Sequence, residues 1–156
     1  MTTRNPKALA IRLLTLVALV ATLSSFSRFL GTDSFKVYLN DNLIFQQYVT
    51  RETPVRALSL SESSGDELLT VYYDHCGRIG SHRTLTLLDG NKVLKKWDFP
   101  DAKTVASSGM SCPIREIKAM QKPRKNINLV YASQELQSPL SLLTFSSSGM
   151  VVKASR

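Results

Sequence analysis

The densest group of chemically capable side chains in this sequence lies in one glycine-containing stretch, Asp74–Arg83. It holds both histidines of the chain, His75 and His82, together with a carboxylate, a thiol and two arginines. Imidazole and thiolate groups bind copper and zinc, and a carboxylate such as that of Asp74 can serve as a further ligand or orient one. One prediction for this loop is therefore a Cu or Zn site made by His75, Cys76 and His82.

The spacing of these residues matches no specific metal signature. Adjacent side chains of an extended segment point to opposite faces, so His75 and Cys76 can bind one ion only where the chain turns. The alternative prediction is a polar loop that contacts a partner and holds no cofactor. The contact residues would then be Asp74, His75, Arg78, His82 and Arg83.

The N-terminal segment has the anatomy of a signal peptide. Two basic residues among the first seven are followed by eleven almost wholly apolar ones, Leu13–Leu23. A membrane-spanning helix needs about 20 apolar residues, and only fifteen residues separate Arg12 from Arg28. We predict a signal peptide over residues 1–25 and export to the periplasm, the cell surface or the extracellular space. An uncleaved anchor made by Leu13–Leu30 is the alternative and would be the only contact with a membrane.

The two cysteines, Cys76 and Cys112, most simply form a disulfide if the chain is exported. In the chain-entropy model a loop of this length contributes roughly 3.5–4 kcal/mol of stability, although the mechanism is model-dependent. A free or metal-binding thiol is the alternative.

Charge and motifs exclude several classes of function. The chain carries a net charge of +8, and without residues 1–25 it has 17 basic and 12 acidic residues, which is an excess of five. That excess falls short of the dense basic stripe of nucleic-acid-binding proteins, so no nucleic-acid partner is expected. Phosphate-binding glycine loops and a Gly-x-Ser-x-Gly nucleophile elbow are absent from the sequence. We therefore expect a binding protein rather than an enzyme.

Alternation of apolar and polar residues dominates beyond Gly31 and predicts strands. The turn residues Asp89-Gly90-Asn91 separate two such runs and predict a hairpin, with Val93 on its buried face. Residues 113–121 predict a short helix capped by Ser111. The candidate strands are Phe35–Leu39, Leu43–Val49, Val55–Leu60, Leu68–Tyr73, Arg83–Leu88, Lys92–Phe99, Ile127–Ala132 and Leu140–Phe145, with Gly149–Ala154 as a short edge strand.

These elements predict an all-β domain over residues 33–154, an antiparallel β-sandwich of about seven to eight strands with one short helix. A partly open barrel is the second choice. Tyrosines and a tryptophan on the strands could supply a face that stacks on sugars or contacts a protein, although most would pack in the core. These aromatic residues are Tyr38, Tyr48, Tyr72, Tyr73 and Trp97. Basic residues over Lys118–Lys125 are a further candidate anion-binding surface.

One stretch carries a family resemblance. Tyr-Tyr-Asp-His-Cys-Gly at residues 72–77, Arg-Thr-Leu-Thr-Leu at 83–87, the Asp-Gly turn, Lys-Lys-Trp-Asp-Phe at 95–99 and Ser111-Cys112 together resemble small uncharacterised exported bacterial proteins with a β-sandwich fold. The resemblance covers Phe35–Phe145 and implies a signal peptide and a β-sandwich, with no known activity. We expect an exported, non-enzymatic β-sandwich module that binds a protein or glycan partner.

Overall fold

The structure is a computed structural model that describes residues 32–50, 52–122, 124 and 126–151. The chain divides into two compact units, Met1–Gly31 and Thr32–Arg156. The first unit, which contains the expected signal peptide, lies outside the described residues. Within the described part of the chain, no helix is long and apolar enough to cross a membrane.

The second unit is mostly β, as predicted, with one α-helix among its described residues. It has more strands than the seven or eight expected, because β7 also pairs and the edge strand predicted over Gly149–Ala154 forms as β10. In chain order the elements are β1 (Ser34–Leu39), β2 (Asn42–Tyr48), β3 (Arg56–Ser59), β4 (Leu68–Asp74), β5 (Arg83–Asp89), β6 (Lys92–Phe99), the 3₁₀ turn η2 (Ala106–Ser108), β7 (Met110–Pro113), α2 (Ile114–Gln121), β8 (Asn126–Ala132), β9 (Leu140–Ser146) and β10 (Met150–Val151).

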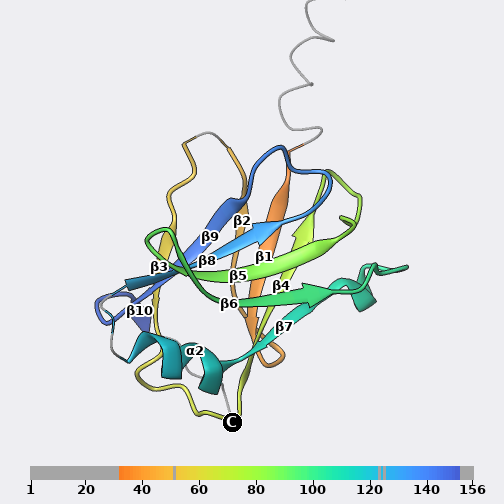
Figure 1. Ribbon diagram of the computed structural model, residues 1–156. Coiled ribbons are helices and arrows are strands. Elements are labelled where there is room, and N and C mark those ends of the chain that lie inside the picture. Colours follow the sequence, from red (N-terminus) through yellow and green to blue (C-terminus); the bar gives the residue numbers. More distant parts are fainter. Residues whose placement is uncertain (1–31, 51, 123, 125, 152–156) are drawn as a thin grey trace, which may run out of the picture. The chain divides into compact units, whose positions relative to one another are not determined.

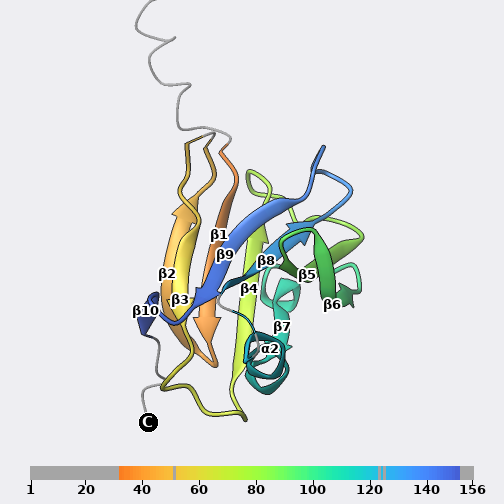
Figure 2. The same cartoon turned by 60° about the vertical axis from the view of Figure 1, so that its left-hand side comes forward.

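The strands form two open sheets, and neither closes into a barrel. The first sheet has the order β2-β1-β4-β7 and is antiparallel throughout. The second has the order β10-β3-β9-β8-β5-β6, in which β3 runs parallel to both of its neighbours while the other pairs are antiparallel. In Figure 1, strands β1 and β4 run across the direction of β5 and β6, and Figure 2 shows the two groups from the side.

One hydrophobic core is shared by both sheets. Every second residue of β1, namely Phe35, Val37 and Leu39, is buried, and Leu85 and Leu87 on β5 follow the same period of two. Side chains of a strand alternate between its faces, so this pattern assigns one face of each sheet to the core.

The predicted hairpin is confirmed as β5–β6, with Asp89 opposite Lys92 and with Gly90 at a φ of +58°. The prediction for its second arm was wrong in one respect. The register shifts between Leu87 and Leu88, and this bulge alters which residues of β6 face inward. Val93, expected on the buried face, is therefore 59% exposed.

Helix α2 forms where it was predicted, but not with the predicted cap. Ser111 lies in strand β7, and its hydroxyl is 2.9 Å from that of Thr70 on β4. The backbone N–H of Ile114 instead donates to the carbonyl of Glu67 at 2.9 Å. The helix is held mainly by its buried residues, Ile114 and Ile117.

Candidate functional site

A tight turn directly after β4 fixes the backbone of His75. The N–H of His75 donates to the carbonyl of Arg78 at 2.8 Å, and the N–H of Arg78 donates back at 3.1 Å. Cys76 and Gly77 adopt positive φ angles of 53° and 85°. The carboxylate of Asp74 accepts the N–H of Gly77 at 2.7 Å, which closes the turn. The turn therefore gives the imidazole a defined direction.

The imidazole of His75 points into the domain, where its side chain is only 4% exposed. Its Nδ1 lies 3.3 Å from Oδ2 of Asp33, and its Nε2 lies 3.0 Å from the hydroxyl of Tyr131 and 3.1 Å from that of Ser133. The ring also packs on that of Tyr73, with 4.6 Å between centroids. We call Asp33, Tyr73, His75, Tyr131, Ser133 and Glu135 the His75 cluster.

Asp33 is the acceptor that organises one side of this cluster. It accepts the hydroxyl of Tyr73 at 3.0 Å and the thiol of Cys76 at 3.2 Å. Burial, and then the hydrogen bond to Asp33, raise the pKa of Tyr73 far above its ordinary value. The hydrogen bond to the same carboxylate is the main cause of a raised pKa for the Cys76 thiol. Both groups therefore stay protonated and hold Asp33 in place as donors.

Glu135 bounds the other side of the cluster, with its Oε2 4.0 Å from Nε2 of His75. It accepts the N–H of Ser81 at 3.0 Å and the hydroxyl of Ser81 at 2.8 Å. Burial raises the pKa of Glu135, but these hydrogen bonds together outweigh it and lower the pKa to about 2. Glu135 is therefore ionised at neutral pH.

Gly80 covers the Nε2 edge of the imidazole. A Cβ atom at this position would lie 2.6 Å from the hydroxyl oxygen of Tyr131, 2.7 Å from Nε2 of His75 and 3.0 Å from Glu135. These approaches are closer than van der Waals contact permits, so only glycine lets the loop close over the cluster.

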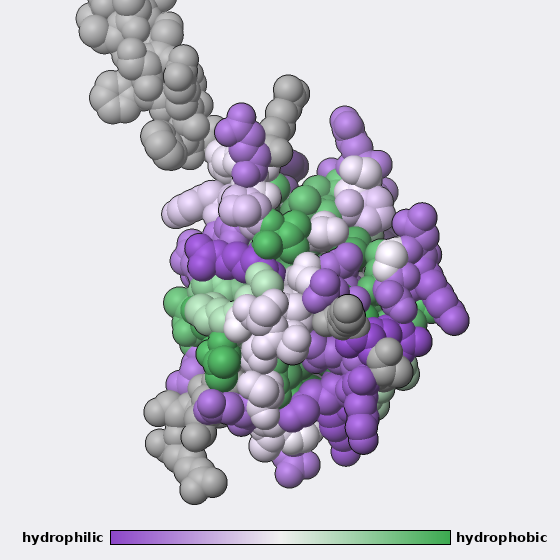
Figure 3. Space-filling view, turned by 90° about the vertical axis from the view of Figure 1, so that its left-hand side faces the viewer, coloured by the Kyte–Doolittle hydropathy of each residue, from purple (hydrophilic) through white to green (hydrophobic). Residues whose placement is uncertain are grey.

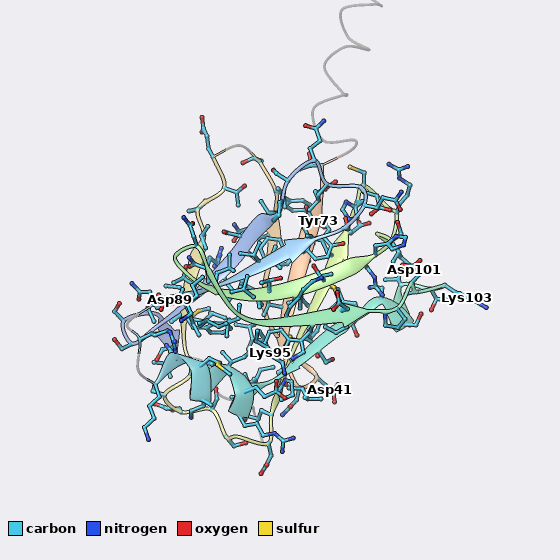
Figure 4. All side chains as sticks on the ribbon, viewed as in Figure 1. Asp41, Tyr73, Asp89, Lys95, Asp101 and Lys103 are labelled. Atoms are coloured by element: carbon cyan, nitrogen blue, oxygen red, sulfur yellow. The ribbon has the colours of Figure 1, made fainter. Side chains whose placement is uncertain are left out.

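The other loop residues singled out from the sequence lie in two environments. Arg83 is buried, and its guanidinium donates to the carbonyls of Ser108 at 2.5 Å and Pro100 at 2.6 Å. Arg78 and His82 are exposed, as is Asp74. The N–H of His82 donates to Asp101, which lies at the end of the β5–β6 hairpin opposite to Asp89 in Figure 4. Of the predicted loop residues, the structure thus brings His75 into the cluster and Cys76 into contact with its Asp33.

The predicted disulfide is wrong, because Cys76 and Cys112 are both free. Cys112 pairs with Leu69 near the start of β4, whereas Cys76 follows the other end of that strand. Asp74 lies five positions after Leu69, a span of about 17 Å at the usual rise of a strand. A disulfide requires Cα atoms within about 7 Å of each other.

The structure also bears on the predicted metal ligands. Among the described residues, no group of three or more His, Cys, Asp or Glu side chains is placed to hold a metal ion. Both nitrogens of His75 already face protein partners, and the Cys76 thiol donates to Asp33. Cys112 is fully buried, and burial, followed by the nearby Glu116, raises the pKa of its thiol to about 12.

A second candidate site lies on the outer face of the first sheet. Tyr38 and Tyr72 meet there edge to face, with 5.5 Å between ring centroids, and Tyr48 is 64% exposed. Tyr72 lies over Gly109, where a Cβ atom would come within 2.9 Å of the tyrosine Cζ and hydroxyl. The register places the following residues on this surface, which we call the tyrosine face: Lys36, Tyr38, Leu43, Gln46, Tyr48, Thr70, Tyr72 and Ser111.

Comparison with known proteins gives no family for this chain: no protein-family model matches it, and no curated protein matches it significantly. The function must therefore be argued from the two sites themselves. Sequence reasoning missed Asp33, Tyr131, Ser133 and Glu135, because no local motif marks them.

Proposed function

We propose that the protein is an exported β-sandwich module that binds a glycan through the tyrosine face. The basic and apolar N-terminal sequence supports export, and the core shared by two sheets supports the sandwich. The observation that carries the proposal is the group of tyrosine rings left on the outer face of the first sheet, beside polar side chains.

The tyrosine hydroxyls of the tyrosine face have unused hydrogen-bonding capacity, whereas those of the His75 cluster do not. Among the described residues, the hydroxyls of Tyr38, Tyr48 and Tyr72 make no hydrogen bond within the protein. The hydroxyls of Tyr73 and Tyr131, by contrast, are both bonded internally. Tyrosine rings combine an apolar body with a polar tip and are enriched where a protein meets a partner. The face is therefore the better candidate for recognition.

The composition of this face suits a sugar. A pyranose ring offers an apolar face of C–H groups and a rim of hydroxyls, so it can stack on a tyrosine while polar side chains bind its rim. Lys36 and Gln46 are both exposed and lie opposite each other on β1 and β2, and Lys36 is also opposite Tyr72 on β4. Donors thus lie directly beside the rings.

Large apolar patches, by contrast, mark many protein-binding surfaces. On the side of the domain in Figure 3, hydrophobic residues form separate groups among hydrophilic ones. The tyrosine face itself has one exposed aliphatic side chain, Leu43, which is 51% exposed. A glycan therefore fits this face better than a hydrophobic protein partner.

Affinity electrophoresis tests the proposal. The wild-type domain is run through native gels containing xylan, laminarin or alginate, which cover neutral and anionic polysaccharides. We expect retardation in at least one gel and its loss in Tyr72→Ala, with retardation kept by Val93→Ser, a control on the exposed part of β6. If the wild type migrates unchanged in every gel, or if Tyr72→Ala is retarded as strongly as the wild type, the proposal is wrong.

A further inference from the structure

Three residues of the His75 cluster have the relative positions of a nucleophile, a general base and its orienting carboxylate. We propose that Ser133 is a nucleophile activated by His75 and Asp33, and that the cluster transfers short acyl groups, such as acetyl, from esters to water. This activity goes beyond glycan binding and does not depend on it.

The distances support these roles. Ser133 Oγ lies 3.1 Å from Nε2 of His75, within the reach of a hydrogen bond. Asp33 Oδ2 lies 3.3 Å from Nδ1 on the opposite side of the ring. A proton on Nδ1 facing the carboxylate leaves the lone pair of Nε2 available to a hydroxyl, which is the tautomer that a Ser-His-Asp arrangement requires.

The surroundings hold this arrangement in place. Tyr73 and Cys76 donate to the two oxygens of Asp33, so the carboxylate is fixed from both sides. The imidazole packs on the ring of Tyr73, and the turn that follows β4 fixes the backbone of His75. A base whose carboxylate and ring are both immobilised needs little reorganisation when it takes a proton.

Two hydroxyls face Nε2, and burial distinguishes them. Tyr131 is fully buried, and burial is the main cause of its raised pKa. Ser133 is only half-buried, at the end of β8. Ser133 is therefore the hydroxyl that an ester can reach, and Tyr131 remains a protonated donor behind it.

The steps of the reaction follow from these contacts. Ser133 Oγ bonds to the acyl carbon while its proton moves to Nε2 of His75, and the resulting imidazolium faces Asp33 and, at 4.0 Å, Glu135. The bond to the leaving alcohol then breaks as Nε2 returns its proton to the alkoxide. Water repeats the cycle on the acyl-enzyme, releasing the carboxylic acid and restoring Ser133.

The site limits the acyl group. Gly80 lies against Nε2 and the Tyr131 hydroxyl so closely that a single Cβ atom would clash. Glu135 is ionised beside the same nitrogen and would repel an anionic acyl group. A short, neutral acyl group is the class that fits.

A covalent probe and a model substrate test the proposal on the folded domain. A fluorophosphonate reacts with activated serines, and p-nitrophenyl acetate reports acetyl transfer. We expect one adduct by intact mass, located at Ser133, and hydrolysis of the acetate. Both should be lost in Ser133→Ala and kept in Ser141→Ala, which removes an exposed hydroxyl on β9. Either an unlabelled wild type or equal labelling of Ser133→Ala would overturn the proposal, and the thermal midpoint of Ser133→Ala shows whether it is folded.

The Asp33→Asn variant tests whether Asp33 positions the imidazole of His75 for catalysis or only stabilises the fold. We expect labelling to slow by 10²- to 10⁴-fold, on the order of the loss when the triad carboxylate is made neutral. Asp33→Glu, which puts a carboxylate back on the same side of the imidazole, should recover part of the labelling rate that Asp33→Asn loses. An unchanged labelling rate in Asp33→Asn would remove Asp33 from the site.

Discussion

Two consecutive tyrosines of β4 belong to different parts of the molecule. Tyr73 is 4% exposed, and its hydroxyl donates to Asp33 within the His75 cluster. Tyr72 points the other way, packs beside Tyr38 and belongs to the tyrosine face. The alternation of a strand thus lets one segment hold the domain together on one side and present a binding surface on the other.

Side chains on the buried and the exposed side of β4 contribute differently to stability. A buried donor or acceptor that loses its partner destabilises the fold, whereas an exposed group can change with little effect on stability. Variants on the two sides of β4 should therefore separate stability from binding.

The largest effect is expected at Gly80. Gly80→Ala pushes a methyl group into Tyr131, His75 and Glu135, and overpacking of this kind lowers the free energy of unfolding by about 2–3 kcal/mol. Gly65→Ala is the matched control, because its new methyl group would meet only Arg115 at 3.7 Å, an ordinary contact. Urea unfolding measures both, and equal stabilities would show that the loop does not close tightly over the cluster.

A smaller loss is expected when one hydroxyl is removed from the buried side. Tyr73→Phe leaves Asp33 without one of its donors, which should lower the free energy of unfolding by about 1–2 kcal/mol because the acceptor is charged and only partly exposed. Tyr72→Phe removes a hydroxyl from the neighbouring residue on the exposed side, and its stability should stay within about 0.5 kcal/mol of the wild type. Urea denaturation of Tyr73→Phe and Tyr72→Phe measures the free energy of unfolding of each variant. A larger loss of stability in Tyr72→Phe than in Tyr73→Phe would contradict the prediction.

The last effect on stability is a dependence on pH from Glu135. Its pKa of about 2 in the folded protein lies below the ordinary value of 4.5. Between these values the unfolded chain binds more protons than the folded one, so stability is present above about pH 5 and is lost as the pH falls toward 2. Glu135→Gln should flatten this decline in thermal midpoint, while Glu52→Gln, at an exposed loop residue, should not. If the thermal midpoints of Glu135→Gln and the wild type fall in parallel as the pH is lowered, Glu135 is not the cause of the decline.

Most strands were predictable from the sequence because they alternate with a period of two, as in Phe35, Val37 and Leu39. Strand β7 was missed because it is four residues long, includes a proline and continues directly into α2. The disulfide was predicted wrongly because sequence spacing does not reveal register, which places Cys112 opposite Leu69.

The sequence identified His75 but not its partners. Ser133 lies 58 residues after His75 in the sequence. Its hydroxyl reaches Nε2 of His75 because the C-terminal end of β8 lies beside the C-terminal end of β4. Asp33 precedes β1, and its position follows from the pairing of Ser34 with Asp74. These contacts depend on long-range register and not on any local motif, so the residues on either side of His75 gave no indication of them.

The central claim, that the tyrosine face of the first sheet binds a glycan, is tested most directly by Gly109→Ala. This change keeps every side chain of the tyrosine face and displaces mainly the ring of Tyr72, whose Cζ would otherwise lie 2.9 Å from the new methyl group. The Cγ2 atom of Thr70, at 3.1 Å from it, is crowded less. Isothermal titration with the polysaccharide that retards the wild type gives the affinity, and urea unfolding gives the stability. The account predicts binding at least about tenfold weaker, a difference of about 1.4 kcal/mol, in a variant that urea unfolding shows to be folded. Unchanged affinity for the glycan would contradict it.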